Sequence, residues 1–262
     1  MENRDQPDSV QTEEPENQPL PRPGLASAWM LAFLFAFFAA VVVYMVGYGV
    51  VLGVEYAAQG VTEPDPDVLE ARMQEHILTP SGLAGIYLVQ CLMVLPLIFF
   101  AAHFPNQSWQ KTLGFHRFGL RSLCTWLMIY AVYFVLQYLI SEALQIDPGD
   151  FMRSLNGSQH LGAALVLIIG APLLEELIFR GYLFKAWRHT RLGLSGTLLL
   201  TSLLFTLLHL GQYNFSVLAI IFTLSLLLGL AREKSGSIWV PLIIHSLNNG
   251  IAAVTVIYFG LL

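Results

Sequence analysis

The strongest constraint on the fold of this chain is a series of long apolar stretches that begins near residue 28 and continues to the C-terminus. An α-helix needs about 20 apolar residues to cross roughly 30 Å of hydrocarbon. Charged residues make up only 12% of the sequence, whereas about 25% is usual in a soluble domain. We therefore expect an all-α fold, a polytopic transmembrane helix bundle of about seven helices, within a range of six to eight. The stretches predict helices at 28–54, 82–104, 119–142, 161–190, 194–212, 215–231 and 237–261.

The segment before the first apolar stretch has a different composition. Residues 1–27 are dense in Pro, Gln, Asn and Glu, with six acidic side chains against Arg4 and Arg22. This composition predicts a disordered acidic tail, followed by one transmembrane domain at 28–262. No nucleotide-binding loop or basic nucleic-acid patch is visible, so the expected surroundings are a lipid bilayer and no nucleic acid. Cys91 and Cys124 lie in apolar runs and are expected to pack rather than to form a disulfide or a thiolate zinc site.

The distribution of basic residues predicts how the helices are oriented in the membrane. The linkers at 105–118, 181–193 and 232–236 are basic, whereas the linkers between them contain few basic residues. Loops rich in Lys and Arg tend to stay in the cytoplasm. We therefore expect a multi-pass protein of the cell (plasma) membrane with a cytoplasmic N-terminal tail. The acidic linker 55–81 and the C-terminus would then lie on the outer side.

Three ionisable residues interrupt the predicted helix 161–190: Glu175, Glu176 and Arg180. An ionised side chain at mid-bilayer costs about 2.5–3.5 kcal/mol or more, so these groups need a compensating role. Glu176 and Arg180 are four residues apart, which suits a helical ion pair, whereas Glu175 has no local partner. Pro172 removes one backbone hydrogen bond and can kink the helix, making room for water beside Glu175. The alternative is that both glutamates are structural.

His209 is expected at the same depth as Glu175. The linker around Leu192-Gly193 predicts a helical hairpin, and the two residues lie 17 positions before and after Leu192. Both would be about 25 Å from the turn, somewhat below the cytoplasmic surface. Phe205 precedes His209 by four residues, so its ring can pack beside the imidazole. A lone buried histidine is more often structural, but the matched depth favours a shared site.

The last predicted helix adds a histidine and an amide. His245 and Asn249 are four residues apart and share a helix face. Asn248 is three residues from His245, so the spacing leaves the choice between the two asparagines open, and either could instead hydrogen-bond between helices. A carboxylate beside an imidazole can activate water for attack on a carbonyl while donors stabilise the oxyanion. The candidate catalytic residues are Glu175, Glu176, Arg180, His209, His245 and Asn249.

Three short motifs in this order carry a resemblance to a known family. Residues 175–180 match EExxxR, residues 205–209 match FxxxH, and residues 245–249 match HxxxN. The set resembles the CPBP family, the type II CAAX prenyl endopeptidases and bacteriocin-processing proteins, also called the ABI family. The resemblance covers about residues 160–262 and implies that the last four helices form the catalytic core. It implies an intramembrane endopeptidase acting on a membrane-associated peptide of CAAX-like or bacteriocin-leader type.

The resemblance also implies roles for the individual residues. Glu175 with His209 would activate the water, His245 with Asn249 would hold the oxyanion, and Glu176 and Arg180 would orient the site. The family is often labelled as metalloprotease, so Zn²⁺ is one expected cofactor, with Glu175, His209 and His245 as its ligands. A metal-free mechanism would use the same residues, and the sequence has no HExxH pair.

Two other functions fit buried Glu and His residues. One is a proton- or ion-coupled transporter, because such residues also form proton relays. Transporters frequently contain repeated halves, and this sequence has no second copy of the EE or HxxxN pattern. The other is a noncatalytic membrane scaffold, which degenerate motifs would favour, whereas all three motifs are intact.

Overall fold

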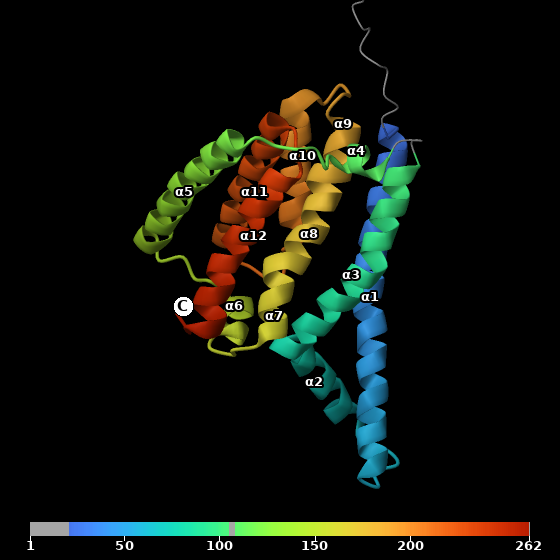
Figure 1. The fold of residues 1–262 in the computed structure, drawn as a ribbon. Helices are drawn as coiled ribbons and strands as arrows, with labels where there is room; N and C mark the ends of the chain where they lie inside the picture. The colour runs from blue at the N-terminus through green and yellow to red at the C-terminus, as the bar shows by residue number, and fades with distance from the viewer. Residues whose placement is uncertain (1–20, 105–107, 262) are drawn as a thin grey trace, which may run out of the picture.

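The computed structural model describes residues 21–104 and 108–261, and this part of the chain contains helices and no strands (Figure 1). Six of its helices are long and apolar enough to cross a membrane, and a shorter apolar helix accompanies them. The expected polytopic all-α bundle is therefore confirmed. The membrane-length helices are α1 (Pro23–Ala58), α3 (Pro80–His103), α5 (Leu120–Ala143), the composite helix Leu161–Trp187, α11 (Phe215–Ser235) and α12 (Trp239–Ala253) with its continuation η3 (Val254–Tyr258).

The first helix is longer than the sequence predicts. α1 has 36 residues, which corresponds to about 54 Å at 1.5 Å per residue and exceeds the thickness of the hydrocarbon core. Its first residue is Pro23, which is tolerated there because the first helical N–H has no intrahelical partner. The predicted disordered tail is therefore wrong for 23–27, and its residues 1–20 lie outside the described part of the chain.

The acidic linker expected at 55–81 contains a further helix, α2 (Pro66–Ile77). Asp65 caps this helix, because its side chain accepts a hydrogen bond from the Asp67 N–H at 3.0 Å. The His76 ring stacks on Tyr48 of α1 with 3.7 Å between ring centroids. Figure 1 shows α2 lying beside the end of α1 that extends past the rest of the bundle. Two other short helices are α4 (Trp109–Leu113) and α6 (Asp150–Leu155).

The composite helix Leu161–Trp187 contains two π-helical segments. It runs through α7 (Leu161–Leu165), η1 (Val166–Gly170), α8 (Ala171–Glu176), η2 (Leu177–Leu183) and α9 (Phe184–Trp187), and η1 and η2 are π-helical. Pro172 has no N–H to donate to the carbonyl of Ile168 in η1, and wider π turns accommodate such a lost bond. Where the sequence predicts a kink at Pro172, the helix thus has π-helical segments before and after the two glutamates.

The helix after the hairpin turn is shorter than expected. α10 covers Gly193–Leu207, whereas the apolar pattern predicts a helix to residue 212. Gly211 has a φ of +84°, which helical backbone does not adopt. Asn214 then starts α11, because its side chain accepts a hydrogen bond from the Val217 N–H at 3.1 Å. His209 therefore lies in the turn after α10 rather than within a helix.

The loops that join the helices gather at two ends of the bundle. At one end, Ile238 N–H donates to the Gly114 carbonyl at 2.8 Å, and Arg188 pairs with Glu233 at 2.6 Å. These contacts tie together 108–119, 188–192 and 236–238, which we call the basic end. At the other end, Asn214 Nδ2 donates to the Asp147 carbonyl at 3.0 Å. We call 59–79, 144–160 and 208–214 the acidic end.

The packing of α10 on α11 is close at Gly229. A Cβ added there would lie 2.5 Å from Leu198 Cδ2, whereas a Cβ added at Gly47 in α1 would meet nothing within 4 Å. We predict that Gly229→Val destabilises the protein by about 1–3 kcal/mol through overpacking. Thermal unfolding in detergent should show a lower midpoint for this variant, with Gly47→Val close to the unsubstituted protein. Equal midpoints for the two variants would contradict the close packing.

Candidate active site

A cavity of about 340 Å³ lies among the helices of the C-terminal half. It brings together four of the six candidate residues, and the other two, Glu176 and Arg180, are fully buried beside it. Its polar lining includes Tyr87, Gln137, Glu175, His209, Gln212, Tyr213, His245, Asn248 and Asn249. Glu175, His209 and Asn249, which are separated by 34 and 40 positions in the sequence, thus face one space.

The ion pair predicted between Glu176 and Arg180 is present. Arg180 Nη1 donates to Glu176 Oε1 at 2.9 Å, and both side chains have no exposed surface. Arg180 Nη2 also donates to the Ser225 carbonyl at 2.9 Å and to the Ser225 hydroxyl at 2.7 Å. The guanidinium lies 4.7 Å from the centroid of the Phe205 ring, a cation–π distance. These contacts fix the pair between η2, α10 and α11.

His245 lies between the two glutamates. Its Nδ1 is 2.9 Å from Glu176 Oε1, and its Nε2 is 3.6 Å from Glu175 Oε2. An ionised carboxylate only accepts hydrogen bonds, so Nδ1 carries the proton in the bond to Glu176. Glu176 therefore orients His245, while Glu175 faces the cavity with its carboxylate near the other ring nitrogen. The histidine closest to Glu175 is thus His245, although the sequence had paired Glu175 with His209.

His209 is oriented by the end of its own helix. Its Nδ1 lies 3.0 Å from the Phe205 carbonyl, which also accepts from the Leu208 N–H at 3.3 Å, while the His209 N–H bonds to the Thr206 carbonyl. A carbonyl only accepts, so Nδ1 is the donor and Nε2 of the neutral ring keeps its lone pair. The centroids of the Phe205 and His209 rings are 5.0 Å apart, as the four-residue spacing predicts. His209 and Glu175 line the same cavity without a direct hydrogen bond.

Both asparagines of α12 line the cavity. Asn249 Nδ2 donates to the Leu167 carbonyl in the π-helical segment η1 at 3.1 Å. Asn248 Nδ2 donates to Asn249 Oδ1 at 3.3 Å, and Asn248 Oδ1 accepts from the Tyr130 hydroxyl of α5 at 3.3 Å. Asn249 is therefore tied to the helix that carries the glutamates, whereas Asn248 is tied to α5. The choice between them stays a prediction.

Some partners of the site were missed by the sequence interpretation. Ser225 supports Arg180, and the Leu167 carbonyl orients Asn249. A serine within the apolar run of α11 is a weak signal of a buried polar contact, and Ser225 could have been found in this way. The bond from Asn249 to the Leu167 carbonyl could not be predicted, because every residue has a backbone carbonyl.

The residues expected to bind zinc do not form a ready metal site. Catalytic zinc sites use three protein ligands with an open position for water. Among the described residues, no three His, Cys, Asp or Glu side chains converge closely enough to hold a metal ion. His245 already faces a carboxylate oxygen with each ring nitrogen. Glu175, His209 and His245 therefore line one cavity as separate acid–base groups rather than as converging ligands.

The cavity extends away from the basic end of the bundle. Besides the polar groups it is lined by Ile146, Pro148 and Phe151 of the acidic end, and by Val256 and Ile257 of η3. The Phe151 and Tyr213 rings pack edge to face at 5.6 Å between these loops. The sequence had placed the site somewhat below the basic, cytoplasmic surface. The structure places it in the middle of the bundle with its cavity directed to the opposite end.

Comparisons with known proteins match the part of the chain that holds this site. Residues 157–251 match the family model described as type II CAAX prenyl endopeptidase Rce1-like. A protein of Escherichia coli, described as "Uncharacterized 24.3 kDa protein", is 33% identical over 122 residues, which are 44% of this chain and 55% of that protein. The chain thus spans about half the length of this relative. No solved structure matches the chain.

The contacts predict that the two neighbouring glutamates differ in their effect on stability. Glu176→Gln leaves Arg180 without its buried counter-charge, and breaking a buried pair costs about 3–5 kcal/mol. Glu175→Gln removes no hydrogen bond of ordinary length, because its nearest partner is at 3.6 Å. Thermal unfolding in detergent should therefore show a large loss of stability for Glu176→Gln only. Similar losses for both variants would contradict the division between them.

Proposed function

Because residues 157–251 place this integral membrane protein in the CPBP family, with its Rce1-like type II CAAX prenyl endopeptidases, we propose that the chain is an intramembrane endopeptidase that hydrolyses a membrane-associated peptide. The observation that supports the proposal most is that one cavity is lined by a carboxylate, Glu175, and by two histidines of fixed orientation, His209 and His245. The proposed substrate is a peptide of CAAX-like or leader type, and the lipid bilayer is the expected surrounding.

The first step needs a base beside a water molecule. Glu175 is about one tenth exposed, and its Oε2 faces the cavity side of His245. In the proposed reaction Glu175, assisted by the free Nε2 of His209, takes a proton from water while the water oxygen bonds to the scissile carbonyl carbon. The proton then passes to the amide nitrogen as the C–N bond breaks, and the products are a carboxylate and an amine.

The tetrahedral intermediate needs hydrogen-bond donors. Asn249 uses one amide N–H for the Leu167 carbonyl, so its second N–H can reach the cavity. His245 donates to Glu176 through Nδ1, and in its doubly protonated form it also presents an Nε2–H to the same space. We assign the oxyanion contacts to His245 and Asn249 on this basis, because donors fixed before the reaction stabilise developing charge best. Glu176 and Arg180 orient His245 and do not touch the substrate.

The central prediction concerns Glu175. Purified protein in detergent is expected to cleave a membrane-associated peptide, and Glu175→Gln is expected to lower kcat by about 100-fold or more, as loss of a general base does. Glu142→Gln serves as the matched control, because Glu142 is exposed at the end of α5. Cleavage should be measured by mass spectrometry of the peptide products. Full activity in Glu175→Gln with a normal melting curve would contradict the proposed mechanism.

A separate experiment tests whether cleavage requires a metal ion. We propose the metal-free form of the mechanism, because the described donors do not converge on one point. Treatment with a strong chelator, followed by elemental analysis of the same sample, is expected to leave cleavage unchanged. Loss of cleavage that added Zn²⁺ restores would contradict the metal-free form.

A further inference from the structure

We propose, building on the function proposed above, that the cavity opens on the non-cytoplasmic side of the membrane and that the substrate is a polypeptide segment exposed on that side. The inference combines the charge of the two ends of the bundle with the direction of the cavity. Neither observation depends on the chemistry of the site.

The basic end carries exposed cations on three separate loops or helix ends. These residues are Lys111, Arg117 and Arg191 in the loops, together with Arg121 and Lys234 at the adjoining ends of α5 and α11. The acidic side chain at the same end of α11, Glu233, is already paired with Arg188 of the basic end. Lys and Arg near membrane helices are retained in the cytoplasm, whereas acidic residues contribute little to orientation. The basic end is therefore the cytoplasmic end.

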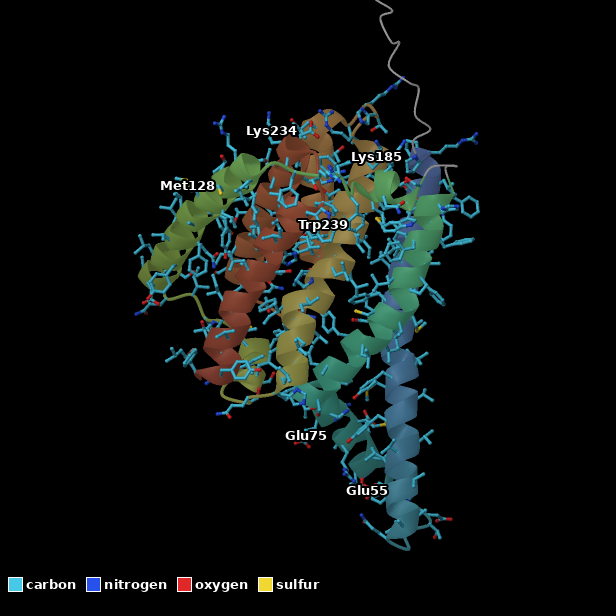
Figure 2. The ribbon with its side chains drawn as sticks, viewed as in Figure 1. Glu55, Glu75, Met128, Lys185, Lys234 and Trp239 are labelled. Carbon is cyan, nitrogen blue, oxygen red and sulfur yellow. The ribbon has the colours of Figure 1, made fainter. Side chains whose placement is uncertain are left out.

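The acidic end has the opposite character. Its two arginines are both held by acids, since Arg72 pairs with Glu55 at 3.4 Å and Arg153 with Asp150 at 2.8 Å. The contrast is visible in Figure 2, where Lys185 and Lys234 lie at one end of the bundle and Glu55 and Glu75 at the other. Among the described residues of the acidic end, every arginine and lysine is therefore paired with an acid, and none counteracts the orientation that the basic end predicts.

The cavity leads from the middle of the membrane to this acidic end. Glu175 lies near the midpoint of the composite helix Leu161–Trp187, and the cavity wall continues to Pro148 and Gln212 in the loops of the acidic end. None of its lining residues belongs to the described loops at the basic end, 108–119, 188–192 and 236–238. The cavity thus follows the half of the bundle that faces away from the cytoplasm.

The loops at the mouth are held in place by their own contacts. Arg153 hydrogen-bonds Asp147 and Asp150, and together with the Gly149 N–H it lowers the pKa of Asp147. The Asp147 carbonyl accepts from Asn214, which joins this loop to the turn that carries His209 and Gln212. The two loops that line this end of the cavity are therefore connected to each other, and we place the mouth between them. Water and a peptide on the non-cytoplasmic side reach Glu175 by this route, and the new carboxylate leaves by it.

Cysteine labelling in a full-length chain tests the inference. The background carries Cys91→Ala and Cys124→Ala, because these are the two native cysteines. Ser108→Cys at the basic end and Ser158→Cys at the acidic end form a matched pair of exposed positions, and Gln212→Cys reports the mouth. Spheroplasts of a bacterial host that express each variant are treated with a membrane-impermeant sulfonated maleimide, before and after permeabilisation.

We expect Ser158→Cys and Gln212→Cys to be labelled equally before and after permeabilisation, and Ser108→Cys to be labelled only afterwards. Labelling of Ser108→Cys but not of Ser158→Cys in intact spheroplasts would overturn the orientation. Labelling of Ser158→Cys without Gln212→Cys would overturn the open mouth. The readout does not use proteolysis, so a failure here is distinct from a failure of Glu175→Gln to lose cleavage.

Discussion

The buried ion pair between Glu176 and Arg180 is the interaction on which the rest of the site depends. The Arg180 guanidinium donates to the Glu176 carboxylate of its own helix and to Ser225 of α11, and it packs on the Phe205 ring of α10. The same carboxylate oxygen bonds His245 of α12. Four helices therefore meet at two charges, and neither charge can be removed without leaving the other unpaired in a low-dielectric interior. The position of His245 relative to the cavity follows from this pairing.

The two adjacent glutamates have different surroundings, and this difference supports different roles for them. Glu176 has no exposed surface and binds both Arg180 and His245 through Oε1, while its buried Oε2 has no hydrogen-bond partner. Glu175 lines the cavity instead, and its carboxylate lies 3.6 Å from Nε2 of His245, beyond an ordinary hydrogen-bond distance. A residue held by strong hydrogen bonds is a poor proton acceptor, whereas a weakly held carboxylate beside water can accept one. The π segments η1 and η2 lie on either side of the two glutamates along the chain. The Leu167 carbonyl of η1 accepts the hydrogen bond that orients Asn249.

The sequence predicts those parts of the structure that depend on local spacing. Apolar length identifies the membrane helices, and a four-residue separation predicts both the Glu176–Arg180 pair and the Phe205–His209 contact. It does not predict which histidine is closest to Glu175, because that depends on how α12 packs on α8. The helix predicted at 194–212 also ends five residues later than α10 does, because the apolar residues Leu208 and Leu210 continue the pattern past the last helical residue. The π turns and the support from Ser225 arise from tertiary packing and backbone geometry.

The short α10 has a consequence for the lipid around the site. Its 15 residues give about 22 Å of helix, although a lipid bilayer presents roughly 30 Å of hydrocarbon. Leu199, Leu203 and Leu207 are exposed along it, as suits a helix that acyl chains would contact directly. Hydrophobic mismatch of this kind is relieved by local thinning of the bilayer. Head groups and water then lie closer to His209 than the average membrane thickness implies, and a peptide needs to leave less of its surrounding lipid to reach the cavity.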